Sequence, residues 1–370
     1  MTLANGPRWP NGGQPGKSRP REKAMTQGLW GKRIVTAVLT IVIAAAAMTP
    51  VPAQERQKVV LVQGIRSMGF SSVFVALGKK YFEEEGLDVD FQILRGDAVT
   101  FQAVVSRSAE FAAVGGNEMI TSSSKGLKGI VAVASVAAAV TVSIVVRKDI
   151  AEARNLNPSL PFEQRFVGLK GLTLAVGAPG GAIHTVIMHA LRSVNIDPTR
   201  DVTIVHLNSP DQMLAALSAK QIDGFAISPP AAETAEANGT GVVLVKFAEG
   251  GVPALSNIVY DALVTRQDYA DQHPDVVRKM VRAIGRACNL LRENPDEAFY
   301  AIHPFFDKTP PEVMKVAVNN VRNALAPHGL FTEEAWKNTM DFNIKAGKIK
   351  TPLDTREGVL WTNKYNAAAR

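Results

Sequence analysis

Polar and apolar positions alternate over Leu87–Leu94, where apolar residues occupy every second position through Ile93. This period of two is typical of a strand with one buried face. The segment before it has helical spacing instead, because Val73 and Leu77 recur on one face and Gly86 follows where a helix commonly ends. The pattern predicts a helix that leads into a strand.

The alternation of strands and helices continues along the chain in two series. In the first series, strands are expected at 58–63, 87–94, 111–114 and 130–134, with helices at 98–107 and from residue 117. In the second, strands are expected at 172–176, 202–207, 223–227 and 242–245, with helices at 181–193, 211–219 and 230–237. Strands and helices that alternate at these lengths indicate parallel α/β sheets. The segments AVVSRSAEFAAVG (103–115) and AALSAKQIDGFAI (215–227) resemble each other, which supports two lobes of related build.

Helices dominate after residue 256. One more strand is expected at 257–265, and helices are expected at 274–293, 295–303, 311–326 and 333–345. Since these helices form no sheet of their own, we expect them to pack on the first lobe, and the chain then crosses between lobes near 146–150 and near 246–256. The first lobe would hold residues 54–147 and 254–370, and the second lobe residues 148–253. Two crossings create a hinge about which the lobes can close.

The first 53 residues have the features of a targeting segment. Residues 1–24 are rich in Gly, Pro, Asn and Arg and are expected to be disordered, and Met25 is an alternative start. A basic pair at 32–33, an apolar run at 34–47 and a Val-Pro-Ala sequence that ends at Ala53 follow in the order of a secretory signal peptide. A membrane anchor is the alternative, but the apolar run is shorter than the roughly 20 residues that a span needs. We therefore expect cleavage near Ala53 and a periplasmic protein.

Charge changes this picture less than its total suggests. The chain has 41 Lys and Arg against 34 Asp and Glu, a formal net charge of +7. Seven of the basic residues and one of the acidic residues lie in the first 53 positions, so the remainder has 34 basic and 33 acidic residues. This balance does not indicate a surface for nucleic acid. With 46% hydrophobic residues over 370 positions, the chain can form two ordinary domains.

No residue pattern points to catalysis. The sequence has no G-x-S-x-G motif, no H-E-x-x-H motif and no cluster of cysteines. GAPGGA (177–182) departs from G-x-G-x-x-G, and GGQPGKS (12–18) has the wrong spacing for a phosphate loop. The lone Cys288 allows no internal disulfide and is expected to be a small buried hydrophobe. We therefore expect no enzyme activity, no cofactor and no metal site.

Several ordered segments carry a family resemblance. They are VFVALGKKYFEEEGLDVDFQILRG (73–96), AVVSRSAEFAAVGGNEMI (103–120), LKGIVAVASV (127–136), GLKGLTLAVGAPGGAIHTVIMHALRSVNIDP (168–198), ALSAKQIDGFAISPP and AGKIKTPLD. Together they cover nearly all of 57–370 and resemble the nitrate, sulfonate and taurine family of ABC-importer binding proteins, which also includes binders of thiamine-pyrimidine precursors and of aromatic acids. The resemblance implies a type II periplasmic-binding-protein fold, an α/β architecture of two lobes with mixed or parallel sheets, flanking helices, a hinge and a ligand cleft between the lobes. It also implies an ABC permease and its ATPase as partners.

The candidate ligand-binding residues lie in loops at the carboxyl ends of the expected strands. In open α/β sheets ligands bind beyond these ends, and helices that start there point N–H groups at the ligand. This rule selects the loops 66–72, 95–97, 115–117, 180–185 and 228–230. The candidate residues are Arg66, Gly69, Phe70, Ser71, Arg95, Gly115, Gly116, Asn117, Ser135, Gly180, Gly181, His184, Thr185, Asn208, Ser228 and Pro229.

The glycine pairs and the arginines favour an acidic ligand. A glycine pair at 180–181 lets a ligand approach the backbone N–H groups of a helix, although an ordinary tight turn has the same pattern. The glycines and asparagine at 115–117 allow the same two interpretations. Arg66 and Arg95 are either bidentate partners of an acid group or solvated loop residues.

Other candidates have less direct chemistry. Phe70 either covers an apolar ligand or lies exposed at the lip of the cleft. Glu118 would favour an amine if it faced the ligand, and otherwise it only complements the helix dipole. His184 lies near a helix start, where it could touch the ligand.

The expected function is that of a periplasmic protein that captures a small organic solute and delivers it to an ABC importer. The helix starts that follow glycines, and the two arginines, favour a sulfonate, a carboxylate or a similar anion as the ligand. The alternative is a periplasmic ligand-sensing protein that feeds a signalling partner. In either case we expect a monomer with no nucleic-acid partner and no stable membrane insertion after signal cleavage.

Overall fold

The computed structural model describes residues 55–94, 96–207, 209–250, 255 and 257–369. The chain divides into two units, Met1–Gln54 and Glu55–Arg370, and the second contains all described elements. The expected signal peptide with its cleavage position, and the candidate residues Arg95 and Asn208, lie outside the described residues.

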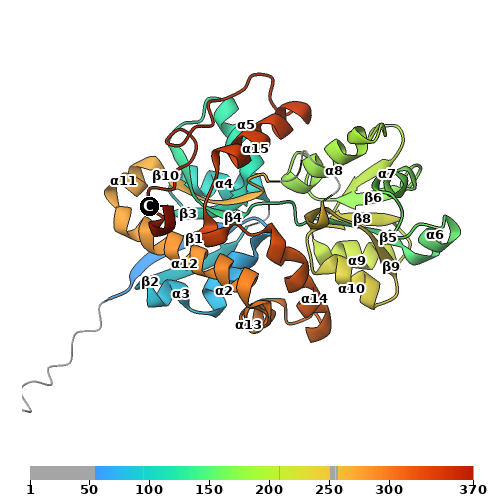
Figure 1. Ribbon diagram of the computed structural model, residues 1–370, viewed down its shortest axis with the longest axis horizontal. Coiled ribbons are helices and arrows are strands. Elements are labelled where there is room, and N and C mark those ends of the chain that lie inside the picture. Colours follow the sequence, from blue (N-terminus) through green and yellow to red (C-terminus); the bar gives the residue numbers. More distant parts are fainter. Residues whose placement is uncertain (1–54, 95, 208, 251–254, 256, 370) are drawn as a thin grey trace, which may run out of the picture. The chain divides into compact units, whose positions relative to one another are not determined.

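Within the described residues, two sheets of five strands form the framework (Figure 1). The first sheet consists of β1 (Gln57–Gln63), β2 (Leu87–Ile93), β3 (Phe111–Gly115), β4 (Ile130–Ala137) and β10 (Asp261–Arg266), in the order β2-β1-β3-β10-β4. The second consists of β5 (Ser143–Arg147), β6 (Thr173–Val176), β7 (Thr203–His206), β8 (Gly224–Ile227) and β9 (Gly241–Lys246), in the order β7-β6-β8-β5-β9. The two sheets therefore repeat one strand order, which agrees with two halves of related build.

One strand of each described sheet runs antiparallel to its neighbours. β10 lies between β3 and β4, and β5 lies between β8 and β9. Each of them is the strand with which the chain enters a sheet after it has left the other one. The two connecting segments run together, because the Phe247 N–H donates to the Val142 carbonyl and the Ile258 N–H donates to the Ala138 carbonyl. Both sheets are therefore mixed, and the chain crosses between them twice.

The first crossing comes earlier than the sequence analysis places it. The residues of β5 were assigned to the first lobe without a strand of their own, but they form a strand that is hydrogen-bonded to β8 and β9 of the second sheet. The crossing therefore lies between Ala137 and Ser143 and not at 146–150. The apolar run 130–146 conceals this break, since β4 and β5 are both buried along most of their length.

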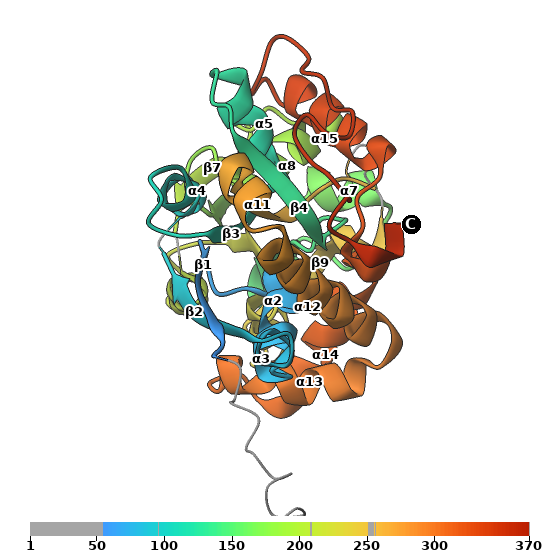
Figure 2. The ribbon, with the colours of Figure 1, turned by 90° about the vertical axis from the view of Figure 1, so that its left-hand side faces the viewer.

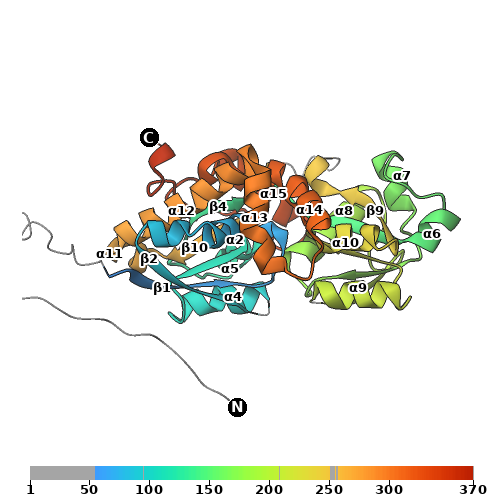
Figure 3. The ribbon, with the colours of Figure 1, turned by 90° about the horizontal axis from the view of Figure 1, so that it is seen from below.

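Helices cover the faces of both sheets (Figures 2 and 3). The first sheet carries α2 (Ser71–Gly78), α3 (Tyr81–Glu84), α4 (Asp97–Val105), α5 (Gly116–Ser124), α11 (Gln267–Gln272), α12 (Pro274–Glu293), α13 (Pro295–Ile302), α14 (Pro311–Val321) and α15 (Glu333–Lys345). The second carries α6 (Lys148–Ala153), α7 (Phe162–Val167), α8 (Ala182–Ser193), α9 (Pro210–Ser218) and α10 (Ala231–Ala237). Each sheet with its helices is called a lobe below. The C-terminal helices return to the first lobe, as expected: Figure 2 shows α12 beside α2, and Figure 3 shows α4 on the opposite side of the sheet. None of the described helices combines the length and the apolarity that a membrane span requires.

Burial follows the pattern of the sequence. In β3, Phe111 and Ala113 face one apolar cluster while Ala112 and Val114 face another, because helices cover both sides of this central strand. Cys288 lies in the first of these clusters, and burial raises the pKa of its thiol to about 12. The interpretation of Cys288 as a small buried hydrophobe is therefore confirmed.

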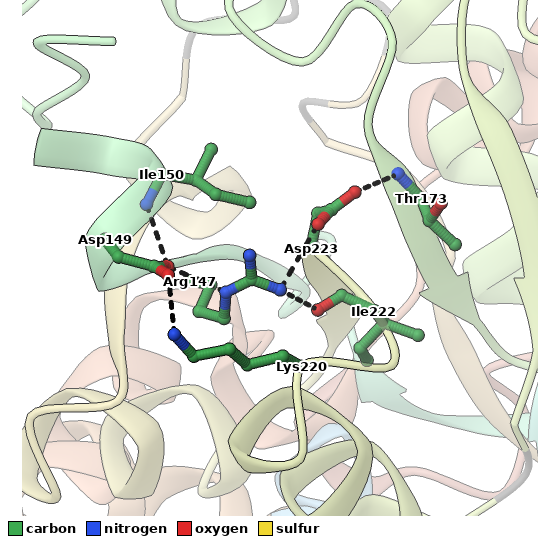
Figure 4. Close-up of polar contacts among 7 residues, drawn as sticks. All are labelled: Arg147, Asp149, Ile150, Thr173, Lys220, Ile222 and Asp223. Atoms are coloured by element: carbon green, nitrogen blue, oxygen red, sulfur yellow. Dashed lines mark hydrogen bonds and ion pairs between the residues drawn. The ribbon is translucent and has the colours of Figure 1, made fainter. Parts of the chain in front are cut away.

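Arg147, at the end of β5, forms hydrogen bonds along one edge of the second sheet (Figure 4). The parallel strands of the sheet begin at this edge. Arg147 donates hydrogen bonds to the Ile222 carbonyl at 3.0 Å and to the carboxylates of Asp149 and Asp223 at 2.7 and 3.3 Å. Asp223 also accepts a hydrogen bond from the Thr173 N–H at 2.9 Å. One network thus joins the starts of β6 and β8 to the end of β5.

The first lobe repeats this network. Arg266, at the end of β10, donates to the carbonyls of Val104 and Ala109 at 3.1 Å each and to the Asp268 carboxylate at 3.2 Å. Glu110 takes the place of the acid before β3 and accepts a hydrogen bond from the Val60 N–H at 2.7 Å. Both networks lie at the amino ends of the parallel strands, so we assign them to stability.

We expect Arg147→Ala to lower the free energy of unfolding by about 2–3 kcal/mol, because it leaves the Ile222 carbonyl and the partly buried Asp223 carboxylate without their partner. Urea unfolding followed by circular dichroism measures this loss. Arg278→Ala is the matched control, since it removes only an exposed pair with Asp275 and should cost at most about 0.5 kcal/mol. Equal losses in the two variants would contradict a role for the network.

Candidate functional site

The carboxyl ends of parallel strands in both sheets lead to the boundary between the lobes. The Met68 N–H, in the loop after β1, donates to the carbonyl of Pro229, in the loop after β8, at 2.9 Å. The hydroxyl oxygens of Thr141, in the first crossing segment, and Ser228 are 2.7 Å apart. Loops from strand ends of both lobes are therefore in contact, at the position where open α/β sheets bind ligands.

Buried polar side chains surround Gly69 at this boundary. A Cβ atom at Gly69 would lie 3.0 Å from Oδ2 of Asp261, 3.4 Å from Oγ1 of Thr141 and 3.5 Å from Oγ of Ser67. Each of these three side-chain-bearing residues is 3% exposed. The absence of a side chain at Gly69 lets the loop after β1 approach the Asp261 carboxylate closely. We call Ser67, Gly69, Thr141 and Asp261 the boundary cluster.

The acidic member of this cluster lies in an unusual environment. Asp261 is the first residue of β10 and lies opposite Gly115 in the sheet. Burial raises the pKa of its carboxyl well above the ordinary value, and the nearby charge of Asp97 raises it further. Burial also raises the pKa of the adjacent Tyr260, whose hydroxyl is hydrogen-bonded to Ser228. The site thus presents acidic and hydroxyl groups in a medium of low polarity.

A second carboxylate connects this region to the start of α8. Burial and the charge of Glu118 raise the pKa of Asp97 to about 6, while a hydrogen bond from the Ala182 N–H acts in the opposite direction. Ala182 is the first residue of α8, so a carboxylate of the first lobe lies at the N-terminus of a helix of the second. A helix N-terminus favours a negative charge, and here the protein itself supplies one.

The glycine pair before α8 forms a closed turn. Gly180 has φ of 78°, a left-handed conformation that suits glycine. Its N–H donates to Nδ1 of His184 at 3.3 Å, and its carbonyl accepts a hydrogen bond from Nζ of Lys348 at 3.0 Å. The Thr185 hydroxyl donates to the Gly181 carbonyl at 2.8 Å. These candidate residues therefore lie together at the helix start, where they satisfy one another.

The glycine pair before α5 also has a structural role. The Gly116 N–H donates to the Tyr260 carbonyl at 2.9 Å, and a Cβ atom at Gly116 would overlap the carbonyl oxygen of Val259. Gly116 thus lets α5 approach the second crossing segment, and its N–H is already bound. Asn117 follows with 6% of its surface exposed, and a Cβ atom at Gly115 would meet its Oδ1.

The other described candidates are placed in different surroundings. Arg66 is exposed and donates to the Phe305 carbonyl at 2.9 Å within the first lobe. Phe70 is 3% exposed, because the turn before α2 directs its ring into the apolar core, so the interpretation as an exposed lip residue is wrong. Ser71 and Ser135 are buried, and their hydroxyls have no hydrogen-bond partner among the described residues. With Arg66 and Gly116 engaged, the described contacts give little support to the leaning towards an anion.

Five residues at the boundary are not among the ligand candidates of the sequence analysis: Ser67, Asp97, Thr141, Tyr260 and Asp261. Asp261 could have been identified from the sequence, since it interrupts the apolar run IVYDALVT in an expected strand. A buried acidic residue is costly unless it is paired or has a function. Ser67 and Asp97 lie in the selected loops 66–72 and 95–97, where other residues are the candidates. Thr141 and Tyr260 lie in the crossing segments, which the strand-end rule does not select.

The sequence of the chain matches a family model described as the NMT1-like family over residues 54–303, which is more than half of its length. The chain belongs to the NMT1-like family. This assignment covers the first lobe up to α13 and the whole second lobe, including all four residues of the boundary cluster.

Two relatives of this NMT1-like protein have low sequence identity to it but match it over most of their length. YtlA of Bacillus subtilis (strain 168), named as a binding protein, is 24% identical over 298 residues, 79% of this chain and 84% of its own length. The riboflavin-binding protein RibY of Chloroflexus aurantiacus is 24% identical over 341 residues, 87% of this chain and 90% of its own length. The solved structure of the alkanesulfonate-binding protein SsuA from Xanthomonas axonopodis pv. citri has a TM-score of 0.62 and 16% identity, and covers 81% of this chain and 96% of that one. The fold is therefore that of periplasmic binding proteins, and the resemblance stated from the sequence is confirmed.

Proposed function

We propose that this protein is exported, captures a small organic solute at the boundary between its lobes, and delivers the solute to an ABC importer. One observation carries the proposal: strand ends of both sheets meet at the boundary cluster, where buried polar side chains surround a residue without a side chain. The names of the relatives add support, since RibY is named for riboflavin and SsuA for alkanesulfonates. Binding, and not catalysis, is the role proposed for these residues.

Closure about the two crossings is the proposed mechanism. Several contacts join the lobes, among them the bond from Nζ of Lys348 to the Gly180 carbonyl and the bond of 2.7 Å from Nδ2 of Asn320 to Oε1 of Glu233. If the lobes turned about the crossings, these bonds would break and a solute could reach the boundary cluster. A solute that contacts both lobes would then shift the population towards the closed form.

The remaining parts of the proposal concern location and partners. The signal peptide with cleavage near Ala53 would release the described part of the chain into the periplasm. The closed form would present a surface to the permease that differs from that of the open form. The ATPase of the importer would supply the energy, and the binding protein would act as a monomer.

A thermal-shift screen tests whether the protein binds solutes. We expect one class among alkanesulfonates, amines, carboxylates, amino acids, pyrimidines and flavins to raise the melting temperature. At about 100 times its dissociation constant, a solute adds about 2.7 kcal/mol, which corresponds to a rise of about 5 °C. Gly69→Ala is the control for location, because its methyl group would crowd the Asp261 carboxylate and should reduce the rise. Flat melting curves over the whole panel would contradict the proposed function.

A further inference from the structure

Asp261 is a buried carboxylate with no partner among the residues that the structure describes. It is 3% exposed, and no described side chain or N–H group donates a hydrogen bond to it or forms an ion pair with it. Acidic side chains are rarely buried in this way unless they are paired, because the loss of hydration is costly. A cost of this kind is retained where a group has a function in binding.

The surroundings of Asp261 can accept hydrogen bonds. Its Oδ2 atom lies beside Gly69, and the hydroxyls of Ser67 and Thr141 lie beside the same glycine. Hydroxyl groups rotate and can both donate and accept, whereas an ionised carboxylate only accepts. A solute that brings N–H donors would therefore find three acceptors at one place.

Two further acidic side chains lie near Asp261 at the boundary. Asp97 is close enough to Asp261 to raise its pKa, and Glu118 acts on Asp97 in the same way. The cation that the structure describes near this boundary, Lys348, donates its hydrogen bond to the Gly180 carbonyl. Within the described residues no lysine or arginine is paired with Asp261 or Asp97, so an N–H donor of a solute would compete with no described cation for either carboxyl group.

We propose that the solute presents a nitrogen group with N–H donors to Asp261, as an ammonium, an amidinium or an amino-substituted heterocycle does. This inference rests on the proposed function and specifies the chemistry of that site. Binding would give the carboxylate the charge-assisted hydrogen bond that it lacks in the free protein. An acidic group elsewhere on the same solute, as in an amino acid or an aminosulfonate, would leave this contact intact.

A protonated Asp261 that donates to an oxygen of an anionic solute is the competing arrangement. The substitution Asp261→Asn separates the two, because the amide keeps N–H donors of similar size but has no negative charge. A nitrogen donor on the solute would lose its charged acceptor in this variant. An oxygen acceptor on the solute would keep a donor.

Matched solutes test the inference on the full protein by calorimetry and thermal shift. The pairs are taurine with ethanesulfonate, β-alanine with propionate, and 4-aminopyrimidine with 4-methylpyrimidine. We expect an amine-bearing member to bind at least about 10-fold more tightly than its partner, and Asp261→Asn to weaken that member by about 10- to 100-fold. We also expect the melting temperature of ligand-free Asp261→Asn to stay equal or rise, since the amide replaces a carboxyl group whose ionised form is costly to bury. If Asp261 had a purely structural role, the melting temperature of Asp261→Asn would be lower than that of the unmodified protein.

Asp88→Asn is the control, because it makes the same chemical change at an exposed position of β2. Tighter binding of the amine-free members, or an unchanged affinity in Asp261→Asn, would overturn the inference. If Asp261→Asn did not fold, the preference of the unmodified protein for the amine-bearing solutes would by itself test the inference. Binding of ethanesulfonate or propionate without any amine would refute the inference and leave the proposed function standing, whereas no binding in the wider screen would refute both.

Discussion

Gly116→Ala is expected to lower the free energy of unfolding by about 3 kcal/mol or more. The added Cβ atom would overlap the carbonyl oxygen of Val259, and α5 cannot move away without breaking the hydrogen bond from the Gly116 N–H to the Tyr260 carbonyl. Most overpacked sites relax by moving side chains, at a cost of about 1–3 kcal/mol. Here two backbone segments collide, so we expect a value at or above the upper end of that range.

Gly115→Ala is the matched control for this prediction. It adds the same methyl group one residue earlier, where the new atom would crowd the side-chain oxygen of Asn117 and make an ordinary contact with Cβ of Ala182, and a side chain can shift more easily than backbone. We expect a loss below about 1 kcal/mol from this change. Urea unfolding of both variants measures the difference, and equal losses would contradict a tight approach between α5 and the second crossing segment.

Asp97→Asn is expected to change the dependence of stability on pH. The pKa of Asp97 is raised from the ordinary 3.8 to about 6 by burial and by Glu118, so the folded protein holds this proton more tightly than the unfolded chain does. The destabilisation is complete above about pH 6 and disappears as the pH falls below about 4. Such a displacement corresponds to about 2–3 kcal/mol at pH 7. This exceeds the contribution of about 0.3–1 kcal/mol that an acid makes in the first turn of a helix.

Chemical unfolding at pH 7.5 and pH 5 measures this effect as a difference between the variant and the unmodified protein. We expect Asp97→Asn to be the more stable protein at pH 7.5 and to lose about half of that advantage at pH 5. The amide can still accept the hydrogen bond from the Ala182 N–H, so the fold should be retained. Asp88→Asn, on the exposed face of β2, is the control and should leave the pH dependence unchanged. An equal gain of Asp97→Asn at both pH values would contradict the account.

The periodic elements of this fold were readable from the sequence. The alternation at 87–94 became β2, and the helices expected at 274–293 and 333–345 are α12 and α15 with the same limits. Their apolar and polar faces differ clearly, so a local pattern is sufficient. β5 was missed because both of its faces are buried, and an apolar strand without alternation cannot be separated from the apolar strand before it.

Only part of the candidate site could be predicted from the sequence, and the reason is geometric. The strand-end rule selected the loops that hold Ser67, Gly69 and Ser228. It could not select Thr141 and Asp261, because they reach the same place through the two crossings and the antiparallel position of β10. Contacts between residues so distant along the chain depend on the register of the assembled sheets, which no local pattern contains.

Hydrogen exchange of the full protein, with and without the solute that gives the largest thermal shift, tests the central claim most directly. The account predicts that protection increases in segments of both lobes that meet at the boundary. These segments are 64–72, 97–100, 115–118, 139–143, 180–186, 228–231 and 258–262. Protection confined to one lobe, or to the C-terminal segment after α15, would contradict a binding site between the two sheets.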